Sequence, residues 1–156
     1  MLEIKLAGIK DLDFIASLYV EQFNSNQNFD YEIEPITIEQ GKHRWETHLK
    51  TKPMLVAYNN DIFLGFCVLN DSFESLNIEN MYVVSSVKSL EIYAEFIFAA
   101  GRYALGSGYS IMSIMIDGQN ESMKNLCLGL GARSDCIYGM MYTYYERFVW
   151  DDLNWM

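Results

Sequence analysis

Several absences limit what kind of protein this sequence can encode. Only 2 of its 156 residues are proline and 21% are charged, so the composition typical of disordered chains is missing. No apolar run reaches the length of about 18 residues that a membrane-spanning helix needs. Charges at Glu3, Lys5 and Lys10 interrupt the apolar core that a signal peptide would require. These absences predict a one-domain globular protein in the cytoplasm.

Basic residues are also scarce. Lys and Arg number 11 against 21 Asp and Glu, which gives a formal net charge of −10, and the basic residues gather only in the loose run GKHRWETHLKTK at 41–52. Nucleic acid binding needs a positively charged footprint, so no nucleic acid partner is expected. The charge suits a cationic small substrate, a basic protein surface, or simple solubility.

Cysteine provides neither a disulfide framework nor a metal site. Cys67, Cys127 and Cys136 are odd in number, lie far apart and have apolar neighbours. Metal-binding spacings such as Cys-x-x-Cys do not occur. We therefore predict three reduced thiols and no bound metal.

The apolar residues that are present alternate between helical and strand-like spacing. Helices are predicted at 10–23, 37–49, 89–108 and 120–131, with Asp11, Thr37 and Asn120 as N-caps. Strands are predicted at 3–7, 53–58, 62–70, 75–84 and 109–116, and two more follow Ala132. The order β-α-α-β-β-β-α-β-α-β-β predicts an α/β (α+β) fold, a single sheet with helices on both faces.

One junction lacks the residue type that its position favours. In MYVVSSVKSLEIYAEF at 81–96, a strand-like run passes into a helix that begins near Ser89. Many α/β enzymes place glycines at such a junction, so that the helix N-terminus can hold a phosphate. No glycine occurs here, so the junction is either a cofactor loop without its glycines or a connection of another kind.

Three segments resemble the GNAT superfamily of acyl-CoA N-acyltransferases, over nearly the whole chain. LVAYNNDIFLGF at 55–66 is similar to the second and third strands of that family, and MYVV lies where its fourth strand ends. NESMKNLCLGLGA at 120–132 is similar to its late motif, in which an Asn opens a helix and a Gly follows eleven residues later. The resemblance implies a GNAT-like domain over 1–148, with a mixed, mostly antiparallel sheet and acetyl-CoA as cofactor.

The resemblance also implies where the pyrophosphate of the cofactor would bind. In the family an Arg or Gln and two small residues follow the fourth strand, and here these three positions hold Lys88, Glu91 and Tyr93. Glycine lets the backbone approach a phosphate closely, and a carboxylate or a bulky ring does not. Lys88 and the hydroxyls of Ser85 and Ser89 are then the expected phosphate ligands.

The acyl end of the cofactor is placed by the same resemblance. The acyl carbonyl is expected against the backbone of Met81, Tyr82 and Val83, where an N–H can stabilise the oxyanion. Asn120 opens the late helix beside the cofactor.

Two catalytic residues are expected at positions where the sequence departs from the family. Cys127 occupies the position of a Tyr that protonates the leaving thiolate in many members, and a small buried apolar residue is the competing interpretation. Some members place a base at the position of Asn77, and Glu79 lies two residues on. Glu79 is either that base or a solvent-facing strand carboxylate.

The acceptor side is expected at the loop NFDYEIEP. Asp30, Glu32 and Glu34 lie there beside two aromatic residues, a combination that suits a primary ammonium group. The competing interpretation is an acidic surface loop.

Residues 149–156 are expected to form an aromatic C-terminal extension. Trp150 and Trp155 are predicted either to fold back on the core or to be buried in a partner, including a second copy of this chain.

Two functions are consistent with these features of the sequence. One is an acyl-CoA-dependent N-acetyltransferase that acts on a primary amine. The other is a catalytically inactive protein of the same fold that binds another protein, and short members with irregular cofactor loops resemble those encoded by bacteriophages. Fold alone does not choose between them.

Overall fold

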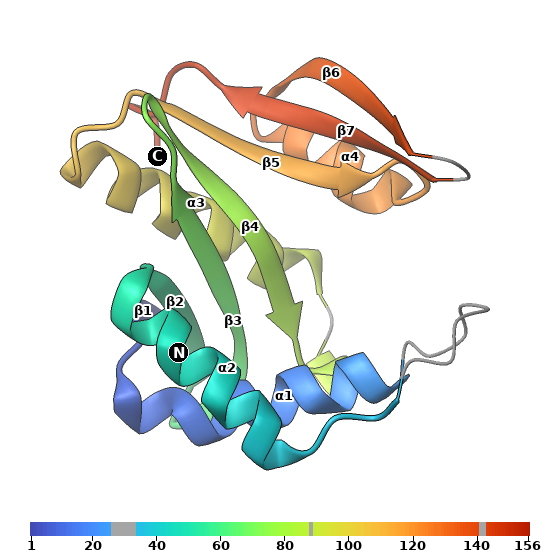
Figure 1. The fold of residues 1–156 in the computed structure, drawn as a ribbon. Coiled ribbons are helices and arrows are strands. Elements are labelled where there is room, and N and C mark those ends of the chain that lie inside the picture. Colours follow the sequence, from blue (N-terminus) through green and yellow to red (C-terminus); the bar gives the residue numbers. More distant parts are fainter. Residues whose placement is uncertain (26–33, 88, 141–142) are drawn as a thin grey trace.

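The computed structural model describes residues 1–25, 34–87, 89–140 and 143–156, and seven strands form one sheet in it (Figure 1). The strands are β1 (Leu2–Leu6), β2 (Met54–Asn59), β3 (Ile62–Asp71), β4 (Ser75–Val83), β5 (Ile111–Asp117), β6 (Arg133–Met140) and β7 (Thr143–Trp150). The helices are α1 (Leu12–Ser25), α2 (Ile38–Thr51), α3 (Leu90–Gly106) and α4 (Glu121–Gly129), with short 3₁₀ turns η1 (Ile9–Asp11) and η2 (Ser85–Val87).

The sheet has the strand order β1-β2-β3-β4-β5-β7-β6. Strands β4 and β5 run parallel, and the other neighbouring strands run antiparallel. Both the predicted order of elements and the predicted mixed, mostly antiparallel sheet are confirmed. Within the described residues, no helix combines the length and the apolar character needed to cross a membrane.

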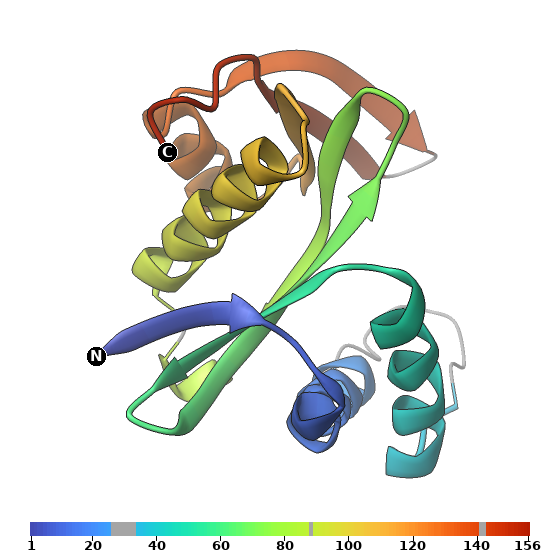
Figure 2. The same ribbon diagram turned by 90° about the vertical axis from the view of Figure 1, so that its left-hand side faces the viewer.

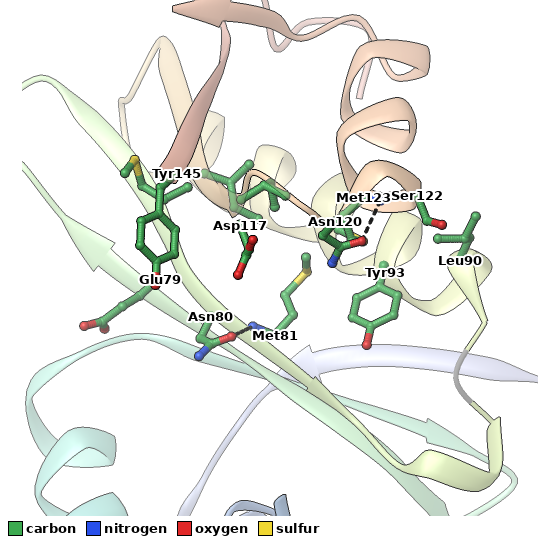
Figure 3. Close-up of a pocket in the computed structure, with 13 residues that line it drawn as sticks. Glu79, Asn80, Met81, Leu90, Tyr93, Asp117, Asn120, Ser122, Met123 and Tyr145 are labelled. Atoms are coloured by element: carbon green, nitrogen blue, oxygen red, sulfur yellow. Dashed lines mark hydrogen bonds between the residues drawn. The ribbon is translucent and has the colours of Figure 1, made fainter. Parts of the chain in front are cut away.

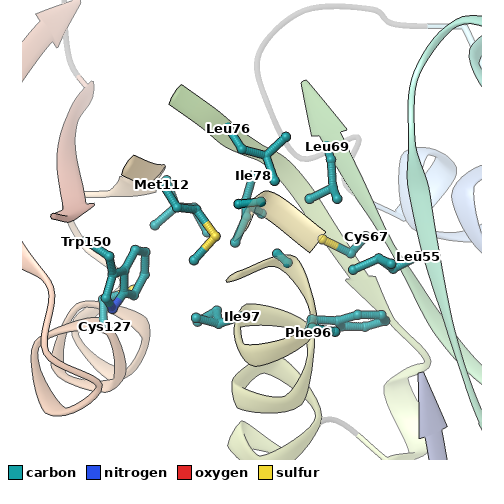
Figure 4. Close-up of a cluster of buried hydrophobic side chains, with 14 of the residues drawn as sticks. Leu55, Cys67, Leu69, Leu76, Ile78, Phe96, Ile97, Met112, Cys127 and Trp150 are labelled. Carbon is teal, nitrogen blue, oxygen red and sulfur yellow. The ribbon is translucent and has the colours of Figure 1, made fainter. Parts of the chain in front are cut away.

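Helices cover both faces of the sheet, as Figure 2 shows for α3 on one side and α1 with α2 on the other. Strand β2 shows why both faces need cover, since its side chains are apolar on both faces of the sheet. Leu55 and Ala57 belong to the core on the α3 side, shown in Figure 4, whereas Met54 and Val56 pack with Trp45 of α2.

Local hydrogen bonds fix the helix starts. Thr37 caps α2 through a reciprocal pair with Gln40, and Asn120 caps α4 by accepting from the Met123 N–H at 3.2 Å. Asp11 stands directly before α1, where an N-cap residue is expected, but its side chain bonds backward along the chain and not to the first turn of α1. The Asp11 carboxylate accepts from the Gly8 N–H and closes the turn η1.

The parallel pair is short, and this shapes the functional region. Strands β4 and β5 are paired only from Ser75 and Ile111 to Ile78 and Ile114. Beyond these residues the two strands diverge, as Figure 1 shows. The pairing of β3 with β4 also shifts register between Val68 and Leu69, so a bulge interrupts β4 at the same level.

The approach of β3 to β4 depends on Gly65. A Cβ atom at this position would overlap the carbonyl oxygen of Tyr82. We therefore expect Gly65→Ala to lower the free energy of unfolding by about 1–3 kcal/mol, because rigid backbone must move. Urea unfolding followed by circular dichroism measures this.

Gly129→Ala is the matched control for that substitution. Gly129 ends α4, and its added Cβ would meet nothing within 4 Å. The control should be neutral or stabilising, because alanine favours a helix over glycine. Equal unfolding midpoints for the two variants would contradict the role given to Gly65.

The C-terminal residues pack on their own domain. Strand β7 continues to Trp150, so the boundary expected between 148 and 149 falls inside a strand. Trp150 and Leu153 are buried in the core. Trp155 rests edge-on against Phe98 of α3, with ring centroids 5.7 Å apart, and leaves 46% of its surface exposed.

Candidate active site

The divergence of β4 and β5 opens a cleft of about 480 Å³, shown in Figure 3. Its walls come from β4, β5, the first turns of α3 and α4, and the start of β7. Glu79, Asn80 and Met81 line the β4 wall, and Asp117 lies at the end of the β5 wall. Polar and apolar groups are mixed along it, as in sites that bind small ligands.

The β4 wall presents backbone groups that β5 no longer pairs. Val84 donates its N–H to the Leu64 carbonyl across the β3–β4 pair at 2.9 Å. Bonded and non-bonded residues alternate along antiparallel strands, so Met81 and Val83 direct their N–H and C=O groups away from β3. The Val83 carbonyl accepts from Gln22 Nε2 at 2.8 Å, which agrees with this direction.

The bulge in β4 places Glu79 where three hollows meet. Pairing passes from Ile78 to Asn80, so Glu79 is the extra residue. A bulge re-aims a side chain and commonly occurs beside an active site. Glu79 lines the cleft, a hollow of about 320 Å³ and one of about 100 Å³, and it forms an ion pair with Lys52 at 3.4 Å.

The larger of these two hollows gives Glu79 a polar surrounding. It is bordered by Asn77 of β4, Ser113 of β5, Tyr138 of β6 and Arg147 of β7. The Ser113 hydroxyl donates to Asn77 Oδ1, so the predicted base position and its neighbour Glu79 line the same space. Glu79 therefore borders both the cleft and this hollow.

The smaller hollow lies against α2. Trp45, His48 and Tyr82 line it with Glu79, and the His48 and Trp45 rings are tilted against each other, with centroids 4.8 Å apart. Burial, with a contribution from the nearby Lys52 charge, lowers the pKa of His48. This shift favours the neutral imidazole.

The residues predicted to bind the cofactor separate into groups. Met81 and Asn120 line the cleft, and Asn120 keeps its Nδ2 on the cleft side while its Oδ1 caps α4 (Figure 3). Ser85 and Ser89 line a neighbouring hollow of about 410 Å³. Val83 is buried, and the side chain of Tyr82 faces α2.

The two unfavourable substitutions at the start of α3 face different spaces. Glu91 lines the hollow that contains Ser85 and Ser89. Tyr93 instead lines the cleft with Leu90, and burial raises the pKa of its phenol. A ring that the sequence places at a glycine position thus forms part of the cleft wall.

The predicted proton donor Cys127 lies away from the cleft. Its side chain is fully buried in the core beside Trp150, as Figure 4 shows, and it is not among the residues that line the cleft. Burial raises the pKa of the Cys127 thiol to about 12. This placement fits the competing interpretation of a small apolar residue.

Two of the predicted acceptor residues, Asp30 and Glu32, lie outside the described residues, as does Lys88. Glu34 is exposed just before α2. Within the part of the chain that the structure describes, no group of three His, Cys, Asp or Glu side chains could hold a metal ion.

Sequence reasoning missed two residues that the cleft brings together, Asn80 and Tyr145. Tyr145 belongs to β7, pairs with Asp117 and reaches toward Glu79 in Figure 3. Asn80 lies next to the bulge. Neither residue belongs to a recognisable sequence motif. Only the pairing of β5 with β7, two segments that are distant in the sequence, could have indicated Tyr145.

Comparison with known proteins finds similarity in structure and none in sequence. No family model and no curated protein sequence matches the chain. An N-acetyltransferase structure from Staphylococcus aureus aligns with a TM-score of 0.75 at 20% identity, over 99% of both chains. The Salmonella typhimurium protein yncA, solved with its cofactor acetyl-CoA, gives 0.75 at 16% identity, over 98% of this chain and 94% of that one.

An acetyltransferase of the GNAT family from Bacillus cereus gives a TM-score of 0.74 at 13% identity, over 97% of this chain and 98% of that one. Likeness at such identities establishes how the chain folds and leaves its chemistry to be argued from the site. The divergent parallel strands, the bulge and these alignments agree, and the protein therefore has the fold of the GNAT superfamily of N-acetyltransferases.

Proposed function

We propose that this protein binds an acyl-CoA, with acetyl-CoA as the expected cofactor, and transfers the acyl group to a primary amine. The observation that carries the proposal is the opening of β4 from β5 after Ile78 and Ile114. It leaves a cleft of about 480 Å³ with unpaired strand backbone along one wall. An extended chain that carries amides can bond to such an edge as an additional strand would.

The acyl carbonyl lies at Met81 in this proposal. The Met81 N–H points into the gap left by β5, and an N–H in this position stabilises the negative charge that develops on a carbonyl oxygen under attack. The pyrophosphate end extends toward α3, where Ser85 and Ser89 line the adjacent hollow. Hydroxyls and the positive end of the 17-residue helix α3 replace the missing glycines.

Glu79 is the base in the proposed reaction. The amine enters from the hollow that contains Asn77 and Arg147, on the far side of Glu79 from the cofactor. Its nitrogen attacks the thioester carbonyl, so a C–N bond forms and the C–S bond breaks. The amine proton passes to the Glu79 carboxylate, directly or through water.

Tyr145 is the proton donor to the departing thiolate. It lines the cleft on the wall opposite β4, and it carries the hydroxyl that Cys127 lacks. The thiolate takes the tyrosine proton, and exchange with water returns the proton held by Glu79 to Tyr145. The net products are an amide and free CoA, and positioning alone accounts for much of the acceleration in such a reaction.

Isothermal titration with acetyl-CoA and with CoA at low salt tests the proposal. We expect micromolar dissociation constants, together with release of free thiol when a panel of primary amines is added. Ser122→Trp should abolish binding, because Ser122 is exposed on the α4 wall and a larger side chain there fills the cleft. Ser17→Trp, at an exposed position of α1, should leave it unchanged.

A non-catalytic protein-binding role is the second candidate. It is supported by the absence of glycine from 85–90 and by the exposed part of Trp155. It predicts no heat with acetyl-CoA at millimolar concentration and a defined oligomer or protein complex that Trp155→Ala disrupts. Micromolar binding of acetyl-CoA that Ser122→Trp abolishes would count against this second role.

A further inference from the structure

The side chain of Asn80 occupies the backbone position to which the proposed function assigns the acyl carbonyl. Its Oδ1 accepts a hydrogen bond from the Met81 N–H at 2.9 Å, drawn as a dashed line in Figure 3. The oxygen belongs to a carbonyl of an amide, so its charge and its geometry resemble those of an acyl oxygen. The proposed oxyanion donor therefore has a partner from the protein itself.

The nitrogen of the Asn80 side-chain amide also forms a hydrogen bond. Asn80 Nδ2 donates to the Tyr82 hydroxyl at 3.0 Å. The Tyr82 ring is stacked on Phe66, with centroids 4.5 Å apart, and meets Tyr19 edge-on at 5.9 Å. Tyr82 is thus fixed by aromatic contacts of the α2-side core, and it directs the Asn80 carbonyl toward Met81.

The same bond explains how the open edge of β4 exists without β5. An unpaired strand edge is unfavourable and attracts other strands unless side chains cover it. Asn80 bonds to the N–H of Met81 and Gln22 bonds to the carbonyl of Val83, two residues further along. Both partners are side chains, which can rotate away, whereas a paired strand could not.

We propose that Asn80 is an internal competitor of the acyl group, and that it sets how strongly the protein prefers acyl-CoA to CoA. The inference rests on the proposed function, since it requires the acyl carbonyl to bond to the Met81 N–H. An acyl-CoA must displace the Asn80 oxygen to make that bond. CoA has no acyl oxygen and leaves Asn80 in place, so the competition weakens acyl-CoA binding selectively.

Titration of Asn80→Ala with acetyl-CoA and with CoA tests this inference. We expect the affinity for acetyl-CoA to rise roughly threefold to tenfold, the effect of one neutral hydrogen bond, while the affinity for CoA changes by less than about twofold. Asn125→Ala, at an exposed position of α4, is the control and should change neither. Tyr82→Phe should give a smaller rise, because it releases Asn80 without removing it.

Hydrogen exchange at the Met81 amide provides a readout that needs no ligand. In the unliganded protein this amide should exchange several times more slowly than in Asn80→Ala. Equal exchange rates, or equal acetyl-CoA affinities of two proteins that both bind it, would overturn the inference alone. Weaker acetyl-CoA binding by Asn80→Ala would overturn it too, since Asn80 would then be a ligand contact. If neither protein binds acetyl-CoA, the proposed function falls and this inference with it.

Discussion

Glu79→Gln should reduce kcat/KM for acetyl transfer by about 100- to 10,000-fold, which is the range that a general base typically contributes. The substitution keeps the shape of the side chain and deletes the group that accepts the amine proton. The dissociation constant for acetyl-CoA, measured by titration, should change by less than about twofold, because the cofactor bonds to strand backbone in the proposed arrangement.

The fold should tolerate this change. The ion pair of Glu79 with Lys52 is partly exposed, with 44% and 31% of the two side chains accessible, and ion pairs in contact with solvent contribute little to stability. The unfolding midpoint in urea should therefore be nearly that of the original protein. A loss of activity with an unchanged midpoint then reports on chemistry.

Glu74→Gln is the matched control, since Glu74 is exposed between β3 and β4 and lines none of the three hollows that meet at Glu79. It should retain full activity. A Glu79→Gln protein that keeps more than about half of its kcat/KM would show that the amine loses its proton elsewhere.

The second large effect is expected at Trp150. We predict that Trp150→Ala lowers the free energy of unfolding by about 3–5 kcal/mol, because an indole that is 1% exposed leaves a cavity in the core. Its Nε1 also donates to the Leu130 carbonyl at 3.0 Å, and that carbonyl would lose its partner. Urea unfolding followed by circular dichroism measures the change.

Trp155→Ala is the control for that experiment, with the same kind of side chain removed five residues further along the chain. Trp155 is 46% exposed and touches Phe98 from the edge, so its loss should cost at most about 1 kcal/mol. Equal losses of stability at the two positions would contradict the difference in burial between Trp150 and Trp155. The two variants also distinguish Trp150, which supports the core, from Trp155, which is accessible to a partner.

Much of the fold follows from local features of the sequence. Thr37 and Asn120 cap their helices by bonds within three residues, and these caps were predictable from residue type and spacing. The apolar periods gave the order of strands and helices correctly. Asp11 shows the limit of local reasoning, since its carboxylate also accepts from Tyr58, 47 residues away, at 2.6 Å.

The candidate site was predictable only where a family motif or a carboxylate marked it. Met81, Asn120 and Glu79 were expected from the sequence, and all three line the cleft. Cys127 was expected as a proton donor because of its place in a helix motif, and that place turns its thiol into the core. A motif gives the position along a helix, whereas packing decides which face the sheet covers.

The sequence by itself determined the elements and their order, because these depend on neighbours along the chain, and its composition determined the acidic net charge. Only the tertiary structure decided that β4 parts from β5 after Ile78, that a bulge turns Glu79 toward three hollows, and that Asn80 bonds to the edge left open. These features arise from pairing between segments far apart in the chain. The register and the separation of the strands depend on how the helices pack on the two faces of the sheet. No local sequence pattern encodes this packing.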